Sequence, residues 1–110
     1  MAKVIFAPLA EEDIDEARRF TRKKWGPVKD AEYRELIRLA VRALEENPRA
    51  GRHRPDIFPY AWTYPIARPG KAARHLFLYR IALNGNVEVA RFLYDGMDLP
   101  GHVPKDWKST

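Results

Sequence analysis

The sequence predicts an α+β fold of two layers, in which a helical hairpin packs on one face of a mostly antiparallel sheet. Two apolar runs, at about 75–83 and 86–94, flank Asn84-Gly85, a pattern typical of a β-hairpin. Ahead of them, two amphipathic stretches separated only by Gly26-Pro27 indicate two antiparallel helices. The predicted order is strand, helix, helix, and then a meander of three antiparallel strands.

The first half of the chain contains the helices. Residues 3–7 contain β-branched and aromatic side chains, which predicts a first strand, and Pro8 suits the start of a helix. The first helix is expected over about 9–25, with acidic residues at its start and basic residues at its end, as the helix dipole favours. Its apolar positions are Ala10, Ile14, Ala17, Phe20, Thr21 and Trp25. The second helix is expected over about 28–46, and its apolar positions are Tyr33, Leu36, Ile37, Ala40, Val41 and Leu44.

The second half is expected to supply the sheet. Residues 48–60 are rich in proline and arginine, which predicts a loop. Residues 61–66 are predicted to form a strand with Trp62, Tyr64 and Ile66 toward the helices, and Pro65 indicates a sheet edge or a strand end. Asn84-Gly85 predicts a two-residue turn with positive φ at both positions. The tail, residues 99–110, is expected to be irregular, with a short turn or helix at most.

Size and composition limit the possible classes of protein. The 110 residues are expected to form one domain, 1–110, with 45% hydrophobic residues to build a core. Without cysteine there is no disulfide framework, and the histidines have no metal-ligand spacing. No apolar run approaches the ~20 residues of a membrane span. We therefore expect a cytoplasmic protein that does not associate with membranes, with no metal and no cofactor.

The positive charge is concentrated in the second part of the chain. Residues 1–46 carry ten basic and ten acidic side chains, whereas residues 47–110 carry ten basic and five acidic ones. No acid lies between Asp56 and Glu88, a stretch that contains Arg68, Lys71, Arg74 and Arg80. This excess favours an anionic partner, either a nucleic acid or an acidic protein segment, although it also serves solubility. We expect Arg74, Arg80 and Arg91 to share one basic face.

The predicted hairpin carries the residues on which chemistry could depend. A ribonuclease needs a base, an acid and cationic stabilisation of its transition state. Arg74, Arg80, Arg91 and Tyr94 could supply these functions. A simpler interpretation is that Arg80 or Arg91 forms an ion pair with Glu88 or Asp98. Because no nucleophile elbow, P-loop or zinc-protease motif is present, we favour a binding protein over an enzyme.

Several segments, taken in order, are characteristic of a known family. They are Ala-Pro-Leu-Ala-Glu-Glu-Asp-Ile at 7–14, Glu46-Asn47-Pro48 with Gly51-Arg52, Arg74-His75, Phe77, Tyr79-Arg80, Val87-Glu88-Val89 and Met97-Asp98. Over nearly the whole chain they resemble the ParE branch of the RelE/ParE toxin superfamily, the toxin halves of bacterial type II toxin–antitoxin modules. The resemblance implies the fold predicted above and a toxin that blocks DNA gyrase without chemistry of its own.

The resemblance also implies a partner. ParE-like toxins are neutralised by a ParD-like antitoxin of the ribbon-helix-helix type, whose C-terminal segment wraps the toxin in a hetero-oligomer. Contacts with the target or the antitoxin are expected from Arg68, Arg74, Arg80, Arg91, Tyr94, Met97 and Asp98.

Two alternatives stay open. RelE-like members cleave messenger RNA in the ribosome, a reaction that would use the four candidate residues named above. A non-toxic member that only binds an antitoxin is the other alternative, since Tyr94-Asp95-Gly96 stands where the family usually has His-Gly-Arg.

Overall fold

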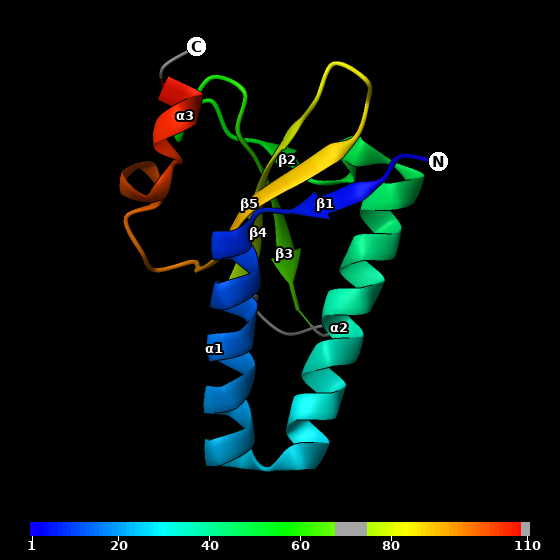
Figure 1. The fold of residues 1–110 in the computed structure, drawn as a ribbon, viewed down its shortest axis with the longest axis vertical. Coiled ribbons are helices and arrows are strands. Elements are labelled where there is room, and N and C mark those ends of the chain that lie inside the picture. The colour runs from blue at the N-terminus through cyan, green and yellow to red at the C-terminus, as the bar shows by residue number, and fades with distance from the viewer. Residues whose placement is uncertain (68–74, 109–110) are drawn as a thin grey trace.

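The computed structural model of the protein describes residues 1–67 and 75–108, and its elements follow the predicted order (Figure 1). The first strand and the helical hairpin are β1 (Val4–Phe6), α1 (Pro8–Trp25) and α2 (Pro27–Glu46). The later strands are β2 (Arg52–His53), β3 (Trp62–Ile66), β4 (His75–Ile81) and β5 (Val87–Tyr94). The short elements are two 3-10 turns, Pro48–Ala50 and Leu99–His102, and the helix α3 (Lys105–Lys108). The unexpected elements are β2 and the 3-10 turn Pro48–Ala50, which both lie inside the predicted loop 48–60.

Within the described residues, the strands form one five-stranded sheet in the order β1-β5-β4-β3-β2. β3, β4 and β5 are the predicted antiparallel meander, and β1 lies parallel to β5 at one edge. The short β2 pairs only with Trp62 and Thr63 of β3. Pro65 therefore lies where β2 no longer covers β3, which suits a residue without a backbone N–H.

The turn between β4 and β5 differs from the predicted two-residue turn. The Ala82 N–H donates to the Asn86 carbonyl and the Gly85 N–H to the Ala82 carbonyl, both at 2.8 Å, so residues 83–85 form a three-residue loop. Gly85 has φ +88°, whereas Asn84 does not have a positive φ. Instead, the Asn84 side chain accepts a hydrogen bond from the Asn86 N–H at 3.0 Å. Asn84 thus contributes its side-chain amide to the turn, and only glycine adopts the left-handed backbone that such loops require.

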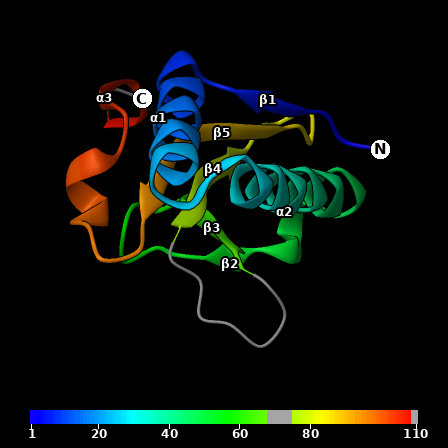
Figure 2. The ribbon, with the colours of Figure 1, turned by 90° about the horizontal axis from the view of Figure 1, so that it is seen from below.

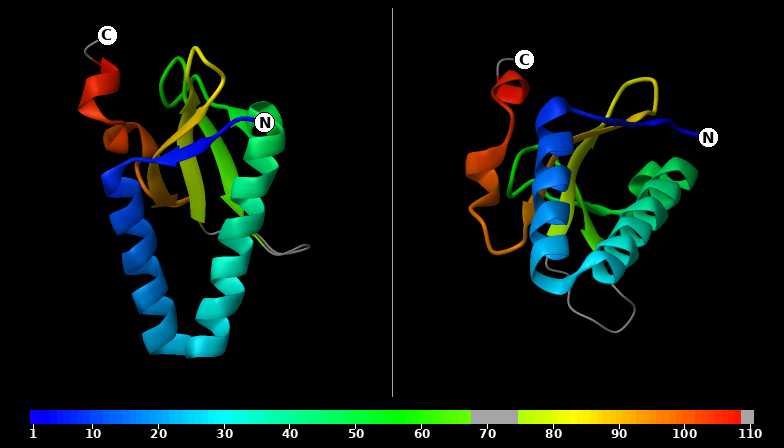
Figure 3. Two further views of the ribbon diagram at one scale, coloured as in Figure 1. Left: turned by 45° about the vertical axis from the view of Figure 1, so that its right-hand side comes forward. Right: turned by 60° about the horizontal axis from the view of Figure 1, so that its bottom comes forward.

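The two helices lie on one face of the sheet and extend beyond its end in a V (Figures 1 and 3). Pro8 and Pro27 stand in their first turns, and Gly26, with φ +93°, joins them. Near the sheet the predicted apolar faces are confirmed, since they pack into its core. Farther out, Phe20 and Trp25 are each 61% exposed although they continue the apolar face of α1. The helices are longer than the sheet they cover, so the end of the predicted face remains open.

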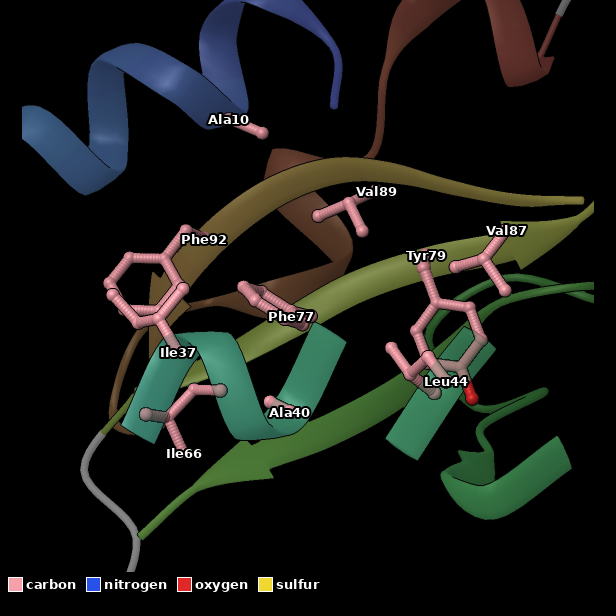
Figure 4. Packing of buried hydrophobic residues seen from close by; sticks show 10 residues of the cluster. All are labelled: Ala10, Ile37, Ala40, Leu44, Ile66, Phe77, Tyr79, Val87, Val89 and Phe92. Carbon is pink, nitrogen blue, oxygen red and sulfur yellow. The ribbon is translucent and has the colours of Figure 1, made fainter. Parts of the chain in front are cut away.

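The main core lies between the helices and the sheet (Figure 4). β4 contributes Phe77 and Tyr79, and β5 contributes Val89 and Phe92. The predicted orientation of β3 is also confirmed, because Ile66 is part of this core and Trp62 and Tyr64 pack against it. The remaining members are Ala10, Ile37, Ala40, Leu44 and Val87. Each large apolar side chain buried here contributes about 1.5–3 kcal/mol.

A second core covers the opposite face of the sheet. Leu76, Leu78 and Leu93 face it from β4 and β5. The cover consists of the 54–61 loop and the C-terminal tail, seen in orange to red on the other side of the sheet from α2 (Figure 2). Trp107 is only 3% exposed, and the Tyr60 hydroxyl donates to its carbonyl at 2.5 Å. Cover on both faces explains why these strands are apolar on both sides.

Candidate functional site

An open groove of about 1040 Å³ runs between the helical hairpin and the adjoining ends of β4 and β5. α1 and α2 form its walls, and the start of β4 and the end of β5 form its floor. Most of its lining is apolar: Ala17, Phe20, Trp25, Leu36, Ile66, Ala67, Phe92, Leu93 and Met97. Pockets for small molecules measure roughly 300–1,000 Å³ and usually enclose their ligand. The size and openness of this groove suit a segment of polypeptide better.

One wall of the groove is fixed by an ion pair between α1 and β5. Arg91 Nε donates to Asp13 Oδ2 at 2.8 Å, and Arg91 Nη2 donates to Oδ1 at 3.1 Å. The same Oδ2 accepts the backbone N–H of Phe92 at 3.1 Å. The hydrogen bonds that Arg91 donates to Asp13 raise the pKa of Arg91. Asp13 therefore neutralises the charge of Arg91, and the polar groups at this point of the groove already have hydrogen-bond partners.

The floor of the groove is aromatic. The His75 ring stacks on Phe92 with parallel planes and centroids 5.0 Å apart. Tyr33 and Tyr94 approach the His75 ring edge-on, each at 5.7 Å. Burial lowers the pKa of His75, against the opposing charge of Asp95, so the imidazole stays neutral at pH 7.

The Tyr33 hydroxyl is the polar exception on this floor. It is buried and has no hydrogen-bond partner within the described residues, and burial raises its pKa. A neutral tyrosine can donate its proton and also accept a hydrogen bond. The groove thus offers an apolar lining with one unsatisfied hydroxyl beneath it.

Arg80 lies elsewhere, beneath the tail. Its Nε donates to Glu88 Oε1 at 2.6 Å, which is one of the alternative ion pairs predicted from the sequence. Its guanidinium also lies over the Trp107 ring, 5.4 Å from the centroid, and 6.0 Å from that of Tyr60. The hydrogen bond to Glu88 raises the pKa of Arg80. Arg80 helps to hold the tail and does not line the groove.

The structure therefore brings only some of the predicted site residues together. Arg91, Tyr94 and Met97 line the groove. The expectation that Arg80 shares a basic face with Arg91 is wrong, because Arg91 pairs with Asp13 of α1 at the groove whereas Arg80 lies against Trp107 of the tail. Asp98 is exposed and starts the 3-10 turn of the tail, where its carbonyl lies 2.7 Å from His102 Nδ1. Arg68 and Arg74 lie outside the described residues.

Several groove residues were not predicted as site residues. In the sequence, Tyr33 and Leu36 indicate only the apolar face of a helix. Asp13 indicates only an acidic residue near the start of a helix, although all three line the groove. His75 was noted in the hairpin, but its aromatic neighbours come from α2 and β5. Sequence alone gives no indication of such contacts, because they join segments that are far apart along the chain.

Two general properties complete the description of the residues placed in the structure. Among them, no group of three His, Asp or Glu side chains is arranged to hold a metal ion. None of the helices they form has the length and apolar character required to cross a membrane.

Comparisons with known proteins agree with this architecture. A solved structure of the chromosomal ParDE toxin–antitoxin system from P. aeruginosa superimposes with a TM-score of 0.69, covering 86% of this chain and 96% of that chain at 19% identity. The strand, helical hairpin and antiparallel meander therefore form a ParE-like fold. Toxin ParE1 of Mycobacterium tuberculosis, from two strains, is 26% identical over 98 residues, or 89% of this chain and 94% of the relative.

The family follows from a further match. Residues 4–99 match the family described as the ParE toxin of the type II toxin–antitoxin system parDE. Because this match covers most of the sequence, the chain belongs to the ParE toxin family.

Proposed function

We propose that this chain is a toxin that inhibits DNA gyrase by binding alone, and that a ParD-like antitoxin neutralises it by occupying the groove. The observation that carries the proposal is the open apolar groove at the foot of the hairpin in a member of the ParE toxin family. The solved P. aeruginosa relative is a ParDE system, and we extend the same kind of partner to this chain. The proposal places the protein in the cytoplasm, where gyrase acts.

The lining of the groove supports an amphipathic segment as its occupant. A helix can bury one apolar face in a groove and leave its polar face in water. Tyr94 and Met97 stand at the rim, 40% and 38% exposed, where such a segment would cover them. A segment that is disordered before binding would become ordered through this contact.

The positions of the charged residues favour binding over RNA cleavage. A cleavage site would need a cation free to stabilise negative charge close to an acid and a base. Arg91 is instead engaged by Asp13, and Arg80 by Glu88 beneath the tail. Tyr94 lies on the groove side, whereas Arg80 does not line the groove. Both described arginine candidates are therefore ion-paired, and Arg80 lies apart from Arg91 and Tyr94.

The experiment uses the purified chain and the antitoxin encoded beside it. Supercoiling by purified bacterial DNA gyrase is measured with increasing toxin, and then with toxin and antitoxin together. We expect inhibition by the toxin and recovery on addition of antitoxin. Cleavage of messenger RNA in a translating extract would contradict the gyrase proposal, and so would antitoxin binding without any growth arrest.

The groove is tested with a pair of matched variants. Met97→Asp places a charge in the groove, whereas Leu83→Asp places one in the exposed turn between β4 and β5. We expect Met97→Asp to weaken antitoxin binding about tenfold or more, because a buried unpaired charge is costly. Leu83→Asp should bind antitoxin like the unmodified chain. Equal affinities for the two variants would place the antitoxin elsewhere.

A further inference from the structure

The far end of the helical hairpin projects past the sheet and exposes apolar side chains (Figures 1 and 3). We call residues 19–29 the hairpin tip. Phe20 and Trp25 are well exposed, and Val28, in the first turn of α2, is 71% exposed. Neighbouring apolar residues of this size on a surface usually mark an interaction site, because burying them against a partner is favourable.

The tip is also strongly basic. Residues 19–29 include five basic side chains and no acidic one. Two of the five are neutralised from α2: Arg22 pairs with Asp30 at 2.7 Å, and Lys29 pairs with Glu32 at 3.3 Å. The other three remain available to a partner.

These three cations lie in the same short segment as the exposed rings, and one of them contacts both rings. Arg19, Lys23 and Lys24 are exposed and pair with no carboxylate in the described part of the chain. Lys24 Nζ lies 5.5 Å from the centroid of the Phe20 ring and 5.2 Å from that of Trp25. The hairpin tip therefore combines exposed apolar side chains with positive charges that its own chain does not neutralise.

The tip is held rigidly although it stands away from the sheet. Asp30 is 3% exposed and accepts two hydrogen bonds from Arg18, both at 3.0 Å, in addition to that from Arg22. This network ties the end of α1 to the start of α2. A preordered surface loses less conformational entropy on binding, so more of its contact energy appears as affinity.

We propose that the hairpin tip is the surface through which this chain binds its protein target, and that the target presents an acidic surface with an apolar hollow. The inference rests on the proposed function, since it takes DNA gyrase to be the protein that carries this surface. Tryptophan is among the residues that most often dominate the energy of an interface, and the free cations select an acidic partner.

Two other occupants fit less well. A second copy of the chain would bring another basic tip against the first, and like charges repel. A nucleic acid would pair with the cations and stack on the rings, but it offers little to cover an aliphatic side chain such as Val28. An acidic protein surface with an apolar hollow can pair with the free cations of the tip and also cover its exposed apolar side chains.

The same geometry explains how an antitoxin in the groove would neutralise the toxin. Phe20, Trp25 and Lys29 belong to the tip and also line the groove. An occupant of the groove would cover these residues and exclude the target. By contrast, Lys23, Lys24 and Val28 do not line the groove, so substitutions there can separate the two functions.

The test uses the full chain with two tip variants, Val28→Asp and the double variant Lys23→Glu/Lys24→Glu. The matched control is Arg38→Glu/Arg42→Glu, which makes the same change in charge on an exposed part of α2 nearer the sheet. For each protein we measure inhibition of gyrase supercoiling, binding to gyrase without DNA, binding to a short DNA duplex, and binding to the antitoxin. Urea unfolding checks that all variants remain folded.

We expect both tip variants to lose inhibition and gyrase binding about tenfold or more while antitoxin affinity stays unchanged. Tip variants as potent as the unmodified chain would overturn the inference and leave the proposed function standing. A loss of binding confined to the DNA duplex, or an equal loss of gyrase binding in the control variant, would also overturn the inference. If the unmodified chain fails to bind gyrase, both the proposed target and this inference are wrong.

Discussion

Asp13 of α1 and Arg91 of β5 bind each other at the edge of the sheet, at the point where β1 ends. Two hydrogen bonds, at 2.8 and 3.1 Å, join them, and the same carboxylate accepts the Phe92 N–H. β1 pairs with β5 only as far as Val89, so beyond it Asp13 supplies the acceptor that a neighbouring strand would have given. One carboxylate thus anchors a helix, closes a strand edge and shapes the groove.

Removal of Arg91 should therefore weaken the fold. Arg91→Ala leaves Asp13, which is only 17% exposed, without its cation, and we expect a loss of about 2 kcal/mol in the free energy of unfolding. Urea denaturation measures the change. Arg38→Ala, which breaks an exposed pair with Glu35, is the control and should leave the midpoint nearly unchanged. Equal effects of the two substitutions would show that the Asp13 pair is only a surface contact.

The stability that Asp30 gives to the end of the helical hairpin should depend on pH. Hydrogen bonds from Arg18 and Arg22 lower the pKa of Asp30 to about 2 from 3.8. Because the folded state favours the ionised form, this stabilisation is complete above about pH 4 and is lost as the pH falls toward 2. Asp30→Asn should be less stable than the unmodified chain at pH 7, and the difference should shrink between about pH 4 and pH 2. A difference that stays constant across this range would contradict the ionic role.

Two glycines should respond differently to alanine. A Cβ on Gly51 would overlap the Thr63 carbonyl and the hydroxyl of the buried Tyr79, which donates to the Pro48 carbonyl. A Cβ on Gly85 would meet nothing within 4 Å, but φ is +88° there. We expect Gly51→Ala to cost about 2–3 kcal/mol and Gly85→Ala about 1 kcal/mol, measured by thermal and urea unfolding. The reverse order would show that backbone strain outweighs packing here.

The tail should behave as part of the core. Trp107 is buried against the second face of the sheet, and its ring packs against the guanidinium of Arg80. Trp107→Ala should cost about 3 kcal/mol in urea unfolding, because it removes a large buried side chain. Tyr60→Phe, which deletes only the hydroxyl bonded to the Trp107 carbonyl, should cost about 1 kcal/mol. If Trp107→Ala unfolds like the unmodified chain, the tail is not part of the cooperative structure.

The strands and helices could be predicted because their signals are local. Apolar spacing placed α1 and α2, and Gly26-Pro27 marked the turn between them. The three strands of the meander also appeared where the apolar runs occur. The two-residue β2 carries too short a pattern to be recognised, and it exists only because β3 offers an edge for it.

The candidate site was less predictable than the fold. Tyr94 and Met97 were expected at a binding surface, and they line the groove. The pairing of Arg91 with Asp13 joins residues that are distant in the sequence, and no local pattern indicates it. The pairing of Arg80 with Glu88 was one of several alternatives, and the hairpin register, which sets these two residues opposite each other, selects it. The tail that lies against Arg80 could not be foreseen.

The sequence by itself determined the order of the elements, the faces of the helices near the sheet and the basic character of the chain. Periodic spacing is a local property, and the net charge depends on composition alone. Only the tertiary structure decided where the helices outgrow the sheet and which arginines are neutralised. Those features depend on relative lengths and on contacts between remote segments. They leave Phe20, Trp25 and Val28 in water, and they make the groove and the hairpin tip the surfaces open to a partner.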